Sequence, residues 1–404
     1  MVDLASRGYY DDSYTTEFLG TVIEATEVGN RAAVVLEETL FYPSSGGQPN
    51  DTGWLGDRRV VDVVVREADG AVVHVLDGGV VTGAVAGRID WGRRFDHMQQ
   101  HSGQHILSQS FLRLAGAPTV GFHLGAEYVS IDLETQGIHE ERLREALALA
   151  NDVIERDLPV RAWFPSPEEL AGISLRKTPD VDGALRVVAI SDFDISACGG
   201  THVARTSQVG LIHCLKTERY KRGLRIYFLG GSRARRDYAA KQQIVSELSA
   251  ALTCAVPELA DTVHRLQGEL QETRRGLAKH HEAELDREAD ELRASATAAG
   301  GLRTIQRSFD RRPIEDLKGL SLRLTTAPAT IALLGAGGDR AQFGLARSDE
   351  LTIDLRPALQ AALAVVGGGK GGGARIVQGG GGVNVALEAV GLALEAARDA
   401  LGLR

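Results

Sequence analysis

The sequence predicts a multidomain α+β protein. Three observations support this fold class. With 404 residues, the chain is too long for one ordinary hydrophobic core. Strand-like and helix-like patterns both occur before residue 231, and both return after residue 299. Between these parts lies a stretch rich in Ala, Glu, Leu, Arg and Gln without a strand signal. We therefore expect four domains, at residues 1–93, 94–231, 232–298 and 299–404.

The first domain reads as β-rich. It contains the β-branched runs "TEFLGTVIEAT", "RAAVVLEETLFYP", "RRVVDVVVRE" and "AVVHVLDGG". Gly, Asp and Asn separate these runs, as they do in hairpins and meanders. The pattern predicts a small β-barrel-like domain.

The second domain opens with a helix. In "RRFDHMQQHSGQHILSQSFLRLAG" apolar residues recur at helical spacing, and the pattern ends at Gly116. Strand-like stretches such as "EYVSIDLE" and "LRIYFLGG" then alternate with the amphipathic helical stretch "HEERLREALALANDVIERDL". This mixture is typical of an α+β domain.

The third domain is predicted to be helical, with a break near Pro257, which suits the first turn of a second helix. In that second helix apolar residues alternate at steps of four and three, which indicates a coiled-coil seam. A hairpin of two helices, or a contact with a partner chain, would cover it. The seam comprises Leu259, Val263, Leu266, Leu270, Thr273 and Leu277.

The fourth domain returns to α/β patterning. It contains "TIALLGAGG" and "AQFGLAR", then the glycine-rich stretch "GGGKGGGARIVQGGGG". Glycines around Lys370 and Arg375 can bring a backbone close to a phosphate. The lysine is followed by Gly371 instead of Ser or Thr, so the stretch is not a nucleotide P-loop. We interpret it as a site for tRNA binding or for domain packing.

Composition excludes several classes of protein. The hydrophobic content of 43% and charged content of 25% are typical of globular proteins. No apolar run approaches the roughly 18 residues of a membrane helix, and no signal-peptide pattern is present. Three cysteines cannot build a disulfide framework. We expect a cytoplasmic protein that does not associate with a membrane.

Charge is unevenly distributed along the chain. The net charge is −9, yet nine Lys or Arg against one acid, Glu218, lie between Arg205 and Arg236. Such a local excess can form a surface that faces phosphates. A solvated face balanced by acids elsewhere in the fold explains it equally well.

Two short motifs contain candidate metal ligands. "HMQQHSGQH" places His97, His101 and His105 one helical turn apart, and "CGGTH" offers Cys198 and His202. Three ligands from one helix would spread over roughly 12 Å, too far for one ion, so two of the three histidines are expected to bind. Cysteine with histidines suits Zn²⁺. The spacing alone does not determine which two of the three histidines bind the metal.

These motifs resemble a known family. "HSGQH" with "CGGTHV" is similar to the zinc signature of the editing domain shared by alanyl- and threonyl-tRNA synthetases. "FYPSSGGQPNDTG" resembles the glycine-rich motif before that domain, and the glycine-rich stretch near Lys370 resembles the C-terminal domain of alanyl-tRNA synthetases. The resemblance covers residues 15–404 and lacks the aminoacylation domain. This architecture is similar to the free-standing alanyl-tRNA editing proteins of the AlaX type, long form.

The resemblance implies a set of site residues. The zinc ligands are His101, His105, Cys198 and His202, whereas His97 has no ligand role in the family and is interpreted as a helix-face residue. Gln104 and Gln48 are the candidate catalytic residues. Gly46, Gly47, Asp51 and His123 are candidates for substrate binding, although Gly46, Gly47 and Asp51 also suit a plain β-turn and His123 a packing role. Candidates for tRNA binding are Arg205, Lys216, Arg225, Lys370 and Arg375.

The implied function is trans-editing. The substrate is tRNA-Ala carrying a wrong amino acid, with seryl-tRNA-Ala preferred over glycyl-tRNA-Ala, and the reaction is hydrolysis of the ester. A second sieve is needed because a binding pocket discriminates poorly between small side chains. The alternative is a non-catalytic, zinc-stabilised tRNA-binding protein. A homodimer through the helical or the C-terminal domain is a further expectation.

Overall fold

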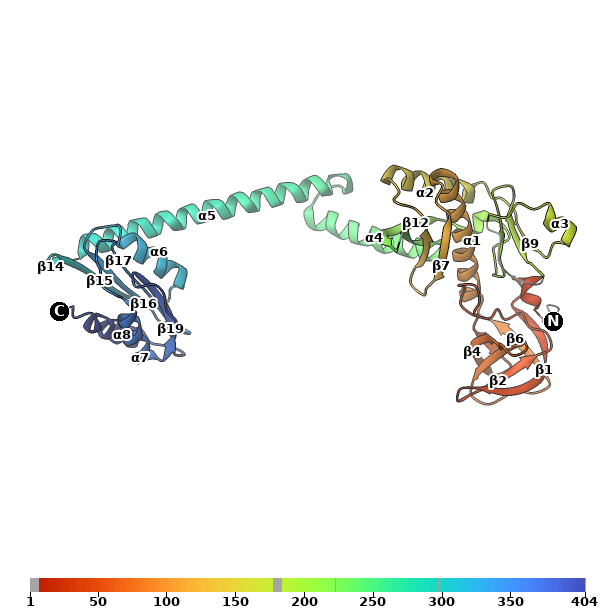
Figure 1. Ribbon diagram of the computed structural model, residues 1–404, viewed down its shortest axis with the longest axis horizontal. Coiled ribbons are helices and arrows are strands. Elements are labelled where there is room, and N and C mark those ends of the chain that lie inside the picture. The colour runs from red at the N-terminus through yellow and green to blue at the C-terminus, as the bar shows by residue number, and fades with distance from the viewer. Residues whose placement is uncertain (1–6, 177–183, 222, 297, 404) are drawn as a thin grey trace. The chain divides into compact units, whose positions relative to one another are not determined.

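The computed structural model describes residues 7–176, 184–221, 223–296 and 298–403. The chain divides into two compact units, residues 1–251 and 252–404 (Figure 1). Several sheets and helices of both units confirm the prediction of a multidomain α+β protein. None of the helices in the described part of the chain is long and apolar enough to cross a membrane.

The first unit begins with a closed six-stranded barrel. Its strands are joined in the order β1-β2-β5-β4-β3-β6. Branched aliphatic side chains such as Val34, Val63 and Leu76 fill the interior because alternate residues of each strand point inward. The strands are β1 (Glu17–Val28), β2 (Arg31–Leu36), β3 (Gly53–Leu55), β4 (Arg58–Val65), β5 (Val72–Asp77) and β6 (Ala84–Ile89).

The predicted helix of the second domain is observed as α1 (Trp91–Ala115). Asp90 caps its start by accepting a hydrogen bond from the N–H of Arg93, and Gly116 ends it in a left-handed conformation. Most residues of α1 between Arg94 and Phe111 are buried, on every face of the helix. Polar side chains on this helix therefore need partners inside the protein. Gln100, for example, hydrogen-bonds both the N–H and the C=O of Gly230.

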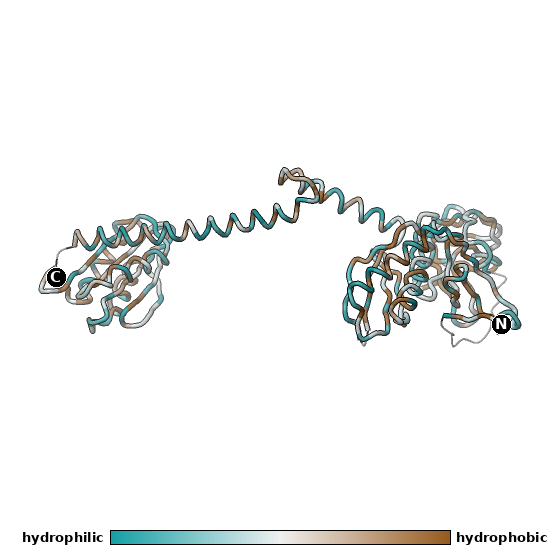
Figure 2. Tube along the Cα trace, turned by 90° about the horizontal axis from the view of Figure 1, so that it is seen from above, coloured by the Kyte–Doolittle hydropathy of each residue, from teal (hydrophilic) through white to brown (hydrophobic). Residues whose placement is uncertain are grey.

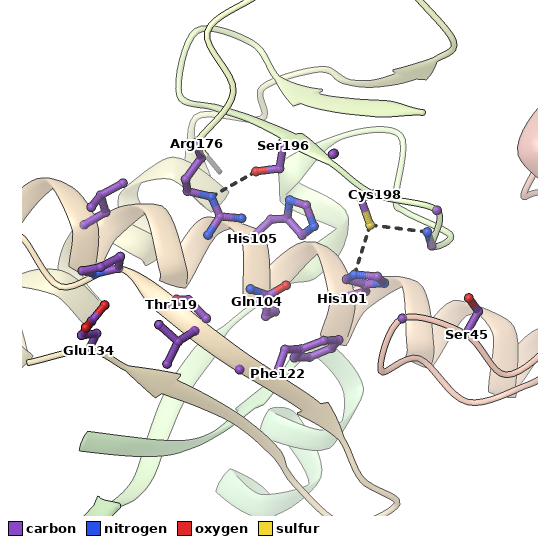
Figure 3. Close-up of a pocket in the computed structure, with 18 of the residues that line it drawn as sticks. Ser45, His101, Gln104, His105, Thr119, Phe122, Glu134, Arg176, Ser196 and Cys198 are labelled. Carbon is purple, nitrogen blue, oxygen red and sulfur yellow. Dashed lines mark hydrogen bonds between the residues drawn. The ribbon is translucent and has the colours of Figure 1, made fainter. Parts of the chain in front are cut away.

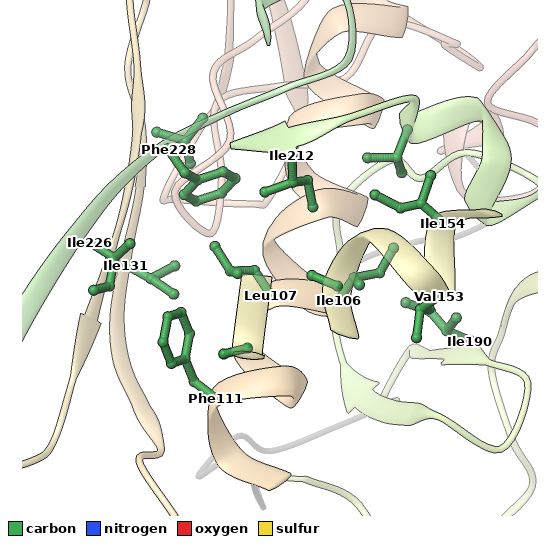
Figure 4. Close-up of a cluster of buried hydrophobic side chains, with 14 of the residues drawn as sticks. Ile106, Leu107, Phe111, Ile131, Val153, Ile154, Ile190, Ile212, Ile226 and Phe228 are labelled. Carbon is green, nitrogen blue, oxygen red and sulfur yellow. The ribbon is translucent and has the colours of Figure 1, made fainter. Parts of the chain in front are cut away.

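Helices and two antiparallel sheets surround α1. One sheet has the order β11-β10-β9 and the other β12-β13-β8-β7. Figure 4 shows the shared core, where Leu107 and Phe111 of α1 meet Ile131, Ile226 and Phe228. The strands are β7 (Thr119–Leu124), β8 (Val129–Leu133), β9 (Val160–Trp163), β10 (Val187–Ile190), β11 (Asp194–Ala197), β12 (Ile212–Tyr220) and β13 (Gly223–Gly230). The helices are α2 (Glu140–Glu155), α3 (Pro167–Ala171) and α4 (Gly231–Leu252).

The second unit starts with the long helix α5 (Leu259–Ser295). Pro257 lies in the short 3₁₀ turn Val256–Glu258 that leads into it. The C-terminal part of α5 packs on α6 through Leu285 and Ala289. Elsewhere α5 is mostly hydrophilic, with isolated hydrophobic positions (Figure 2).

A mixed sheet of order β14-β15-β16-β17-β19-β18 forms the rest of this unit. Residues of β16 alternate between its two faces: Leu333 packs with α7 and α8, and Leu334 with α6 and the end of α5. The strands are β14 (Ala298–Ala299), β15 (Leu302–Phe309), β16 (Thr330–Ala336), β17 (Ala341–Arg347), β18 (Gly368–Gly369) and β19 (Ile376–Gly381). The helices are α6 (Ile314–Leu324), α7 (Arg356–Val366) and α8 (Leu387–Ala400).

Candidate metal centre and its cavity

Four side chains from two distant segments meet in the first unit. His101 and His105 lie one turn apart on α1, and Cys198 and His202 come from the turn after β11. One ligand atom from each lies within 4.8 Å of the others. Sγ of Cys198 is 3.4 Å from Nε2 of His101 (Figure 3). It is 3.3 Å from Nε2 of His202. The cluster can therefore surround a single ion.

The far side of each imidazole is held by a polar side chain. Nδ1 of His101 lies 2.8 Å from Oε1 of Gln48, and Nδ1 of His105 lies 3.0 Å from Oδ2 of Asp194. Nδ1 of His202 lies 3.1 Å from the hydroxyl of Ser102. An amide oxygen and a carboxylate can only accept, so His101 and His105 each carry a proton on Nδ1. Nε2 of both rings is then the nitrogen that faces the centre, the arrangement typical of metal-bound histidine.

The electrostatics of the cluster favour a thiolate. Burial opposes ionisation, but the rings of His101 and His202 lower the pKa of the Cys198 thiol well below its usual range. Burial lowers the pKa of His202 to about 3, so this imidazole stays neutral. Burial also acts against charge on His105, but its hydrogen bond with Asp194 raises its pKa to about 9. A thiolate among imidazoles is a donor set that Zn²⁺ prefers.

The glycine turn of "CGGTH" is required by close packing. A Cβ at residue 200 would lie 2.2 Å from Cε1 of His101, so only glycine fits there. The N–H of Gly200 also points to Sγ of Cys198, 3.4 Å away. The buried guanidinium of Arg186 donates to the carbonyl oxygens of Cys198 and Gly200, at 3.2 and 2.8 Å. The shape of the turn is thus fixed from both sides.

The cluster forms part of the wall of a cavity of about 770 Å³. Phe122 stacks on the ring of His101, with ring centroids 5.1 Å apart. Gln104 and Thr119 bring polar groups to the same wall, and both donate to the hydroxyl of Ser108. Oε1 of Gln104 has no partner among the described residues and is free for a ligand. The remaining wall includes Tyr42, Ser45, Leu112, Pro118, Val120, Glu134 and Arg176.

The other predicted residues near this site have different surroundings. Gly46 lines the cavity, and a Cβ at Gly47 would lie 3.0 Å from the ring of Phe122. Gln48 is 1% exposed and bonds His101 and Thr201, so it supports a ligand from behind. Asp51 is also fully buried but lies away from the cavity wall, where it binds other parts of the chain.

Asp51 forms an ion pair with Arg94 at 2.5 Å and accepts a hydrogen bond from the N–H of Tyr42. These contacts connect the glycine-rich loop to α1. His123 is exposed and is not among the residues that line the cavity. His97 is buried on α1, where burial lowers its pKa to about 3, and it stands outside the four-residue cluster.

The predicted tRNA-binding residues of the first unit are all engaged with acids. Arg205 pairs with Asp157 at 2.6 Å. Lys216 pairs with Glu218. The same holds for Arg225, which is bound by Asp132.

In the second unit, Lys370 lines a cavity of about 340 Å³ together with Arg340, Gln342 and Gln378. Arg375 pairs with Asp349. Lys370 is therefore the candidate for which the structure shows a cavity and no acidic partner among the described residues.

Several residues of the site were not singled out from the sequence. Phe122, Asp194 and Arg186 contact the ligands or their turn directly. Asp194 lies only four residues before Cys198, at the start of the strand that leads to it. An acidic residue so close to a candidate ligand could have indicated a partner for one of the histidines.

Comparison with known proteins shows which proteins this site resembles. Residues 185–227 match the "Threonyl and Alanyl tRNA synthetase second additional domain", a segment that includes Cys198 and His202. The chain is 31% identical over 388 residues to the alanine–tRNA ligase of Pyrococcus abyssi, covering 92% of this chain and 41% of the ligase. It thus spans about two fifths of the synthetases that it matches.

Smaller relatives match as well. The alanyl-tRNA editing protein AlaX-L of Pyrococcus horikoshii is 28% identical over 390 residues, covering 92% of this chain and 93% of that protein. The alanyl-tRNA editing protein Aarsd1 of Bos taurus is 34% identical over 277 residues, covering 63% and 61% of the two chains. The resemblance inferred from the motifs is confirmed: the chain is a relative of the alanyl-tRNA synthetases and of the free-standing alanyl-tRNA editing proteins. Its match to AlaX-L runs almost from end to end of both chains.

Proposed function

We propose that the protein is a trans-editing hydrolase that removes a wrong amino acid from tRNA-Ala. The observation that supports this most is the cluster of three imidazoles and one thiolate, with each Nδ1 already held, in the wall of a cavity. The named relatives AlaX-L and Aarsd1 are alanyl-tRNA editing proteins, which supports the same reaction.

The residues present fit Zn²⁺. Their donor atoms match the ligand types of zinc sites, and their mutual distances allow one ion. Four protein donors form the closed set of a structural site, so with all four bound the metal would mainly shape the part of the cavity that receives the aminoacyl end. When bound, the ion supplies a positive centre that orients or polarises that group. Displacement of one donor, with activation of water, is the alternative mechanism.

The reaction is hydrolysis of the ester between the amino acid and the terminal ribose. Water attacks the carbonyl carbon, and the ribose oxygen leaves and takes a proton, giving a free amino acid and a free tRNA hydroxyl. Gln48 and Asp194 accept from Nδ1 of His101 and His105 and so turn Nε2 of these rings toward the metal position, and Ser102 holds the ring of His202. Phe122, Val120 and Pro118 supply the apolar surface of the cavity in which the ester would lie.

We propose seryl-tRNA-Ala as the preferred substrate. The seryl hydroxyl can hydrogen-bond the polar wall formed by Gln104 and Thr119. Alanine cannot, and a site built to bond a hydroxyl rejects the analogue that lacks it. Glycyl-tRNA-Ala fits by size but gains no such bond.

We propose that tRNA also contacts the second unit. Lys370 and Arg340 face a cavity walled by glycine backbone, which suits a phosphate of the tRNA. The seam of α5 is exposed, with Val263 at 41%, Leu270 at 52% and Leu277 at 70% exposure. A homodimer through α5 would cover these side chains.

Deacylation of three substrates tests the proposal. Purified protein is incubated with Ser-, Gly- and Ala-tRNA-Ala, and the loss of each ester is followed. Selective loss of the seryl ester is expected, and the Cys198→Ala variant should lose both metal and activity. Retention of all three esters with intact tRNA binding indicates the non-catalytic tRNA-binding protein instead. Full activity of Cys198→Ala without zinc defeats the metal assignment.

A further inference from the structure

Arg176 places its guanidinium in the cavity wall, and the proposed reaction has not yet given this group a role. Its Nε lies 2.8 Å from Oδ1 of Asp194 and donates to the hydroxyl of Ser196 at 3.0 Å (Figure 3). Both terminal amino groups of the guanidinium lack a partner among the described residues. The side chain is only 14% exposed. Its four terminal N–H groups thus have no acceptor in the described part of the chain.

The position of this guanidinium is fixed relative to the metal centre. The other oxygen of Asp194 accepts from Nδ1 of His105 at 3.0 Å. One carboxylate thus bridges Arg176 and a metal ligand. The main chain of Arg176 is fixed as well, because its N–H donates to the carbonyl of Ile195 at 2.8 Å. The carboxylate of Asp194 and the imidazole of His105 therefore lie between the terminal amino groups of Arg176 and the metal position.

Asp194 pairs with the Nε edge of Arg176, so an anionic ligand group would bind at the terminal amino groups of the guanidinium. Among the described lining residues, Arg176 is the only Lys or Arg and Glu134 the only Asp or Glu. In Figure 3 the labelled Glu134 lies across the cavity from Arg176 and away from Cys198. A guanidinium with free N–H groups binds phosphate oxygens in a fork geometry.

An aminoacylated tRNA has one anion close to its ester. The phosphodiester that precedes the terminal nucleotide is separated from the ester by a single ribose. We propose that Arg176 binds this phosphodiester while the aminoacyl group lies at the metal centre, with Asp194 setting the distance between them. This inference rests on the proposed editing function and assigns the recognition of the terminal nucleotide to the same cavity.

Substrates with and without this phosphate test the proposal. The first is seryl-tRNA-Ala, the second is the same tRNA with one neutral methylphosphonate at the last linkage, and the third is seryl-adenosine, which has no phosphate. For Arg176→Gln we expect a loss of roughly tenfold to a hundredfold in kcat/KM on the tRNA, the value of one or two charge-assisted hydrogen bonds. Its hydrolysis of seryl-adenosine, which has no phosphate, should fall by a much smaller factor, and retained zinc should show that the cluster is intact.

The neutral linkage supplies a measurement that needs no variant. The methylphosphonate should slow the wild type by the same factor as Arg176→Gln, and the variant should lose nothing further on it. Arg176→Lys should recover part of the rate. A control is Arg161→Gln, an exposed arginine on β9 that is not among the cavity residues, and it should have no effect.

Three outcomes overturn the inference. An equal loss on tRNA and on seryl-adenosine shows that Arg176 acts on the ester. Loss of zinc in Arg176→Gln shows that it acts through Asp194. A wild type insensitive to the methylphosphonate excludes recognition of that phosphate. These results leave the proposed function standing, whereas a wild type that hydrolyses none of the seryl esters defeats both.

Discussion

Oε1 of Gln48 lies 2.8 Å from Nδ1 of His101 and also accepts a hydrogen bond from the N–H of Thr201 at 3.1 Å. Because Thr201 follows the glycine turn, one amide joins the barrel loop, the ligand helix and the Cys198 turn. The same side chain donates from Nε2 to the hydroxyl of Thr201. Gln48 is therefore a positioning residue that fixes the tautomer of His101.

Replacing Gln48 by Ala should weaken zinc binding. Loss of a partner behind a metal-bound histidine typically costs about 10- to 100-fold in affinity. Gln48→Glu keeps an acceptor for His101 and should retain more of the affinity than Gln48→Ala. Zinc affinity is measured by competition with a chelator. Equal affinities for wild type and Gln48→Ala contradict this role.

Replacing Gly200 by Ala should displace His101. The added Cβ would lie 2.2 Å from the ring, in a wall too dense to yield, so the metal cluster must open. Gly199→Ala is the matched control, because its Cβ would be 3.5 Å from the Tyr10 hydroxyl, an ordinary contact. Metal analysis of both purified variants should show zinc only in Gly199→Ala. If Gly200→Ala retains zinc and activity, the turn is less constrained than its packing indicates.

Arg186 should stabilise the same turn from the other side. It is 6% exposed and donates to the carbonyls of Cys198, Gly200 and Tyr10. Arg186→Gln leaves buried carbonyls without donors, which we expect to cost about 2 to 4 kcal/mol in unfolding free energy. Thermal unfolding with and without zinc measures this. Arg113→Gln is a control, because Arg113 also donates to backbone carbonyls, but at Asp192 and Phe193. An equal effect of the two substitutions argues against a special role for Arg186.

The sequence was informative wherever a residue type limits the chemistry. Histidine and cysteine at the observed spacings, together with the family resemblance, identified the four residues that the structure brings together. The sequence did not show in which direction a given side chain points. In β7, Phe122 contacts His101 and the neighbouring His123 is exposed, because successive side chains of a strand point to opposite faces.

Ion pairs between residues far apart in the chain also could not be predicted from the sequence. A count of cations could not reveal that Arg205, Lys216 and Arg225 each meet an acid. Nor could it show that Arg176 and His105 share one carboxylate. Such contacts depend on strand register and helix packing. The α+β class was predictable because hydrophobic periodicity is a local property.

His74 should make the barrel sensitive to acid. Its Nδ1 donates to the carbonyl of Val34, and its Nε2 accepts from the hydroxyl of Thr39 at 2.7 Å, so the folded ring is neutral. Burial lowers the pKa of His74 to about 4 from its ordinary value of 6.5. Above pH 6.5 both states are neutral and nothing is lost. Between pH 6.5 and 4 the unfolded state binds the proton first, so stability falls as the pH falls.

The size of this effect follows from the shift in pKa. Between pH 7 and 4.5 His74 should cost about 2 to 3 kcal/mol of unfolding free energy. His74→Gln removes the titrating group, so its stability should fall less over this range than that of the wild type. Denaturant unfolding at both pH values gives the difference. Parallel pH dependences in the two proteins show that His74 does not contribute.

Separating the two units should separate chemistry from tRNA affinity. Residues 1–251 contain the metal cluster, the 770 Å³ cavity and their own hydrophobic cores, whereas Lys370 and the α5 seam lie in residues 252–404. A fragment of residues 1–251 should therefore bind zinc and hydrolyse seryl-adenosine as the full chain does. It should bind tRNA-Ala more weakly, with a smaller salt dependence, because fewer cations contact phosphate. Sedimentation should also show a monomer for the fragment and a dimer for the full chain. If tRNA affinity and oligomeric state are unchanged by the deletion, neither function resides in the second unit.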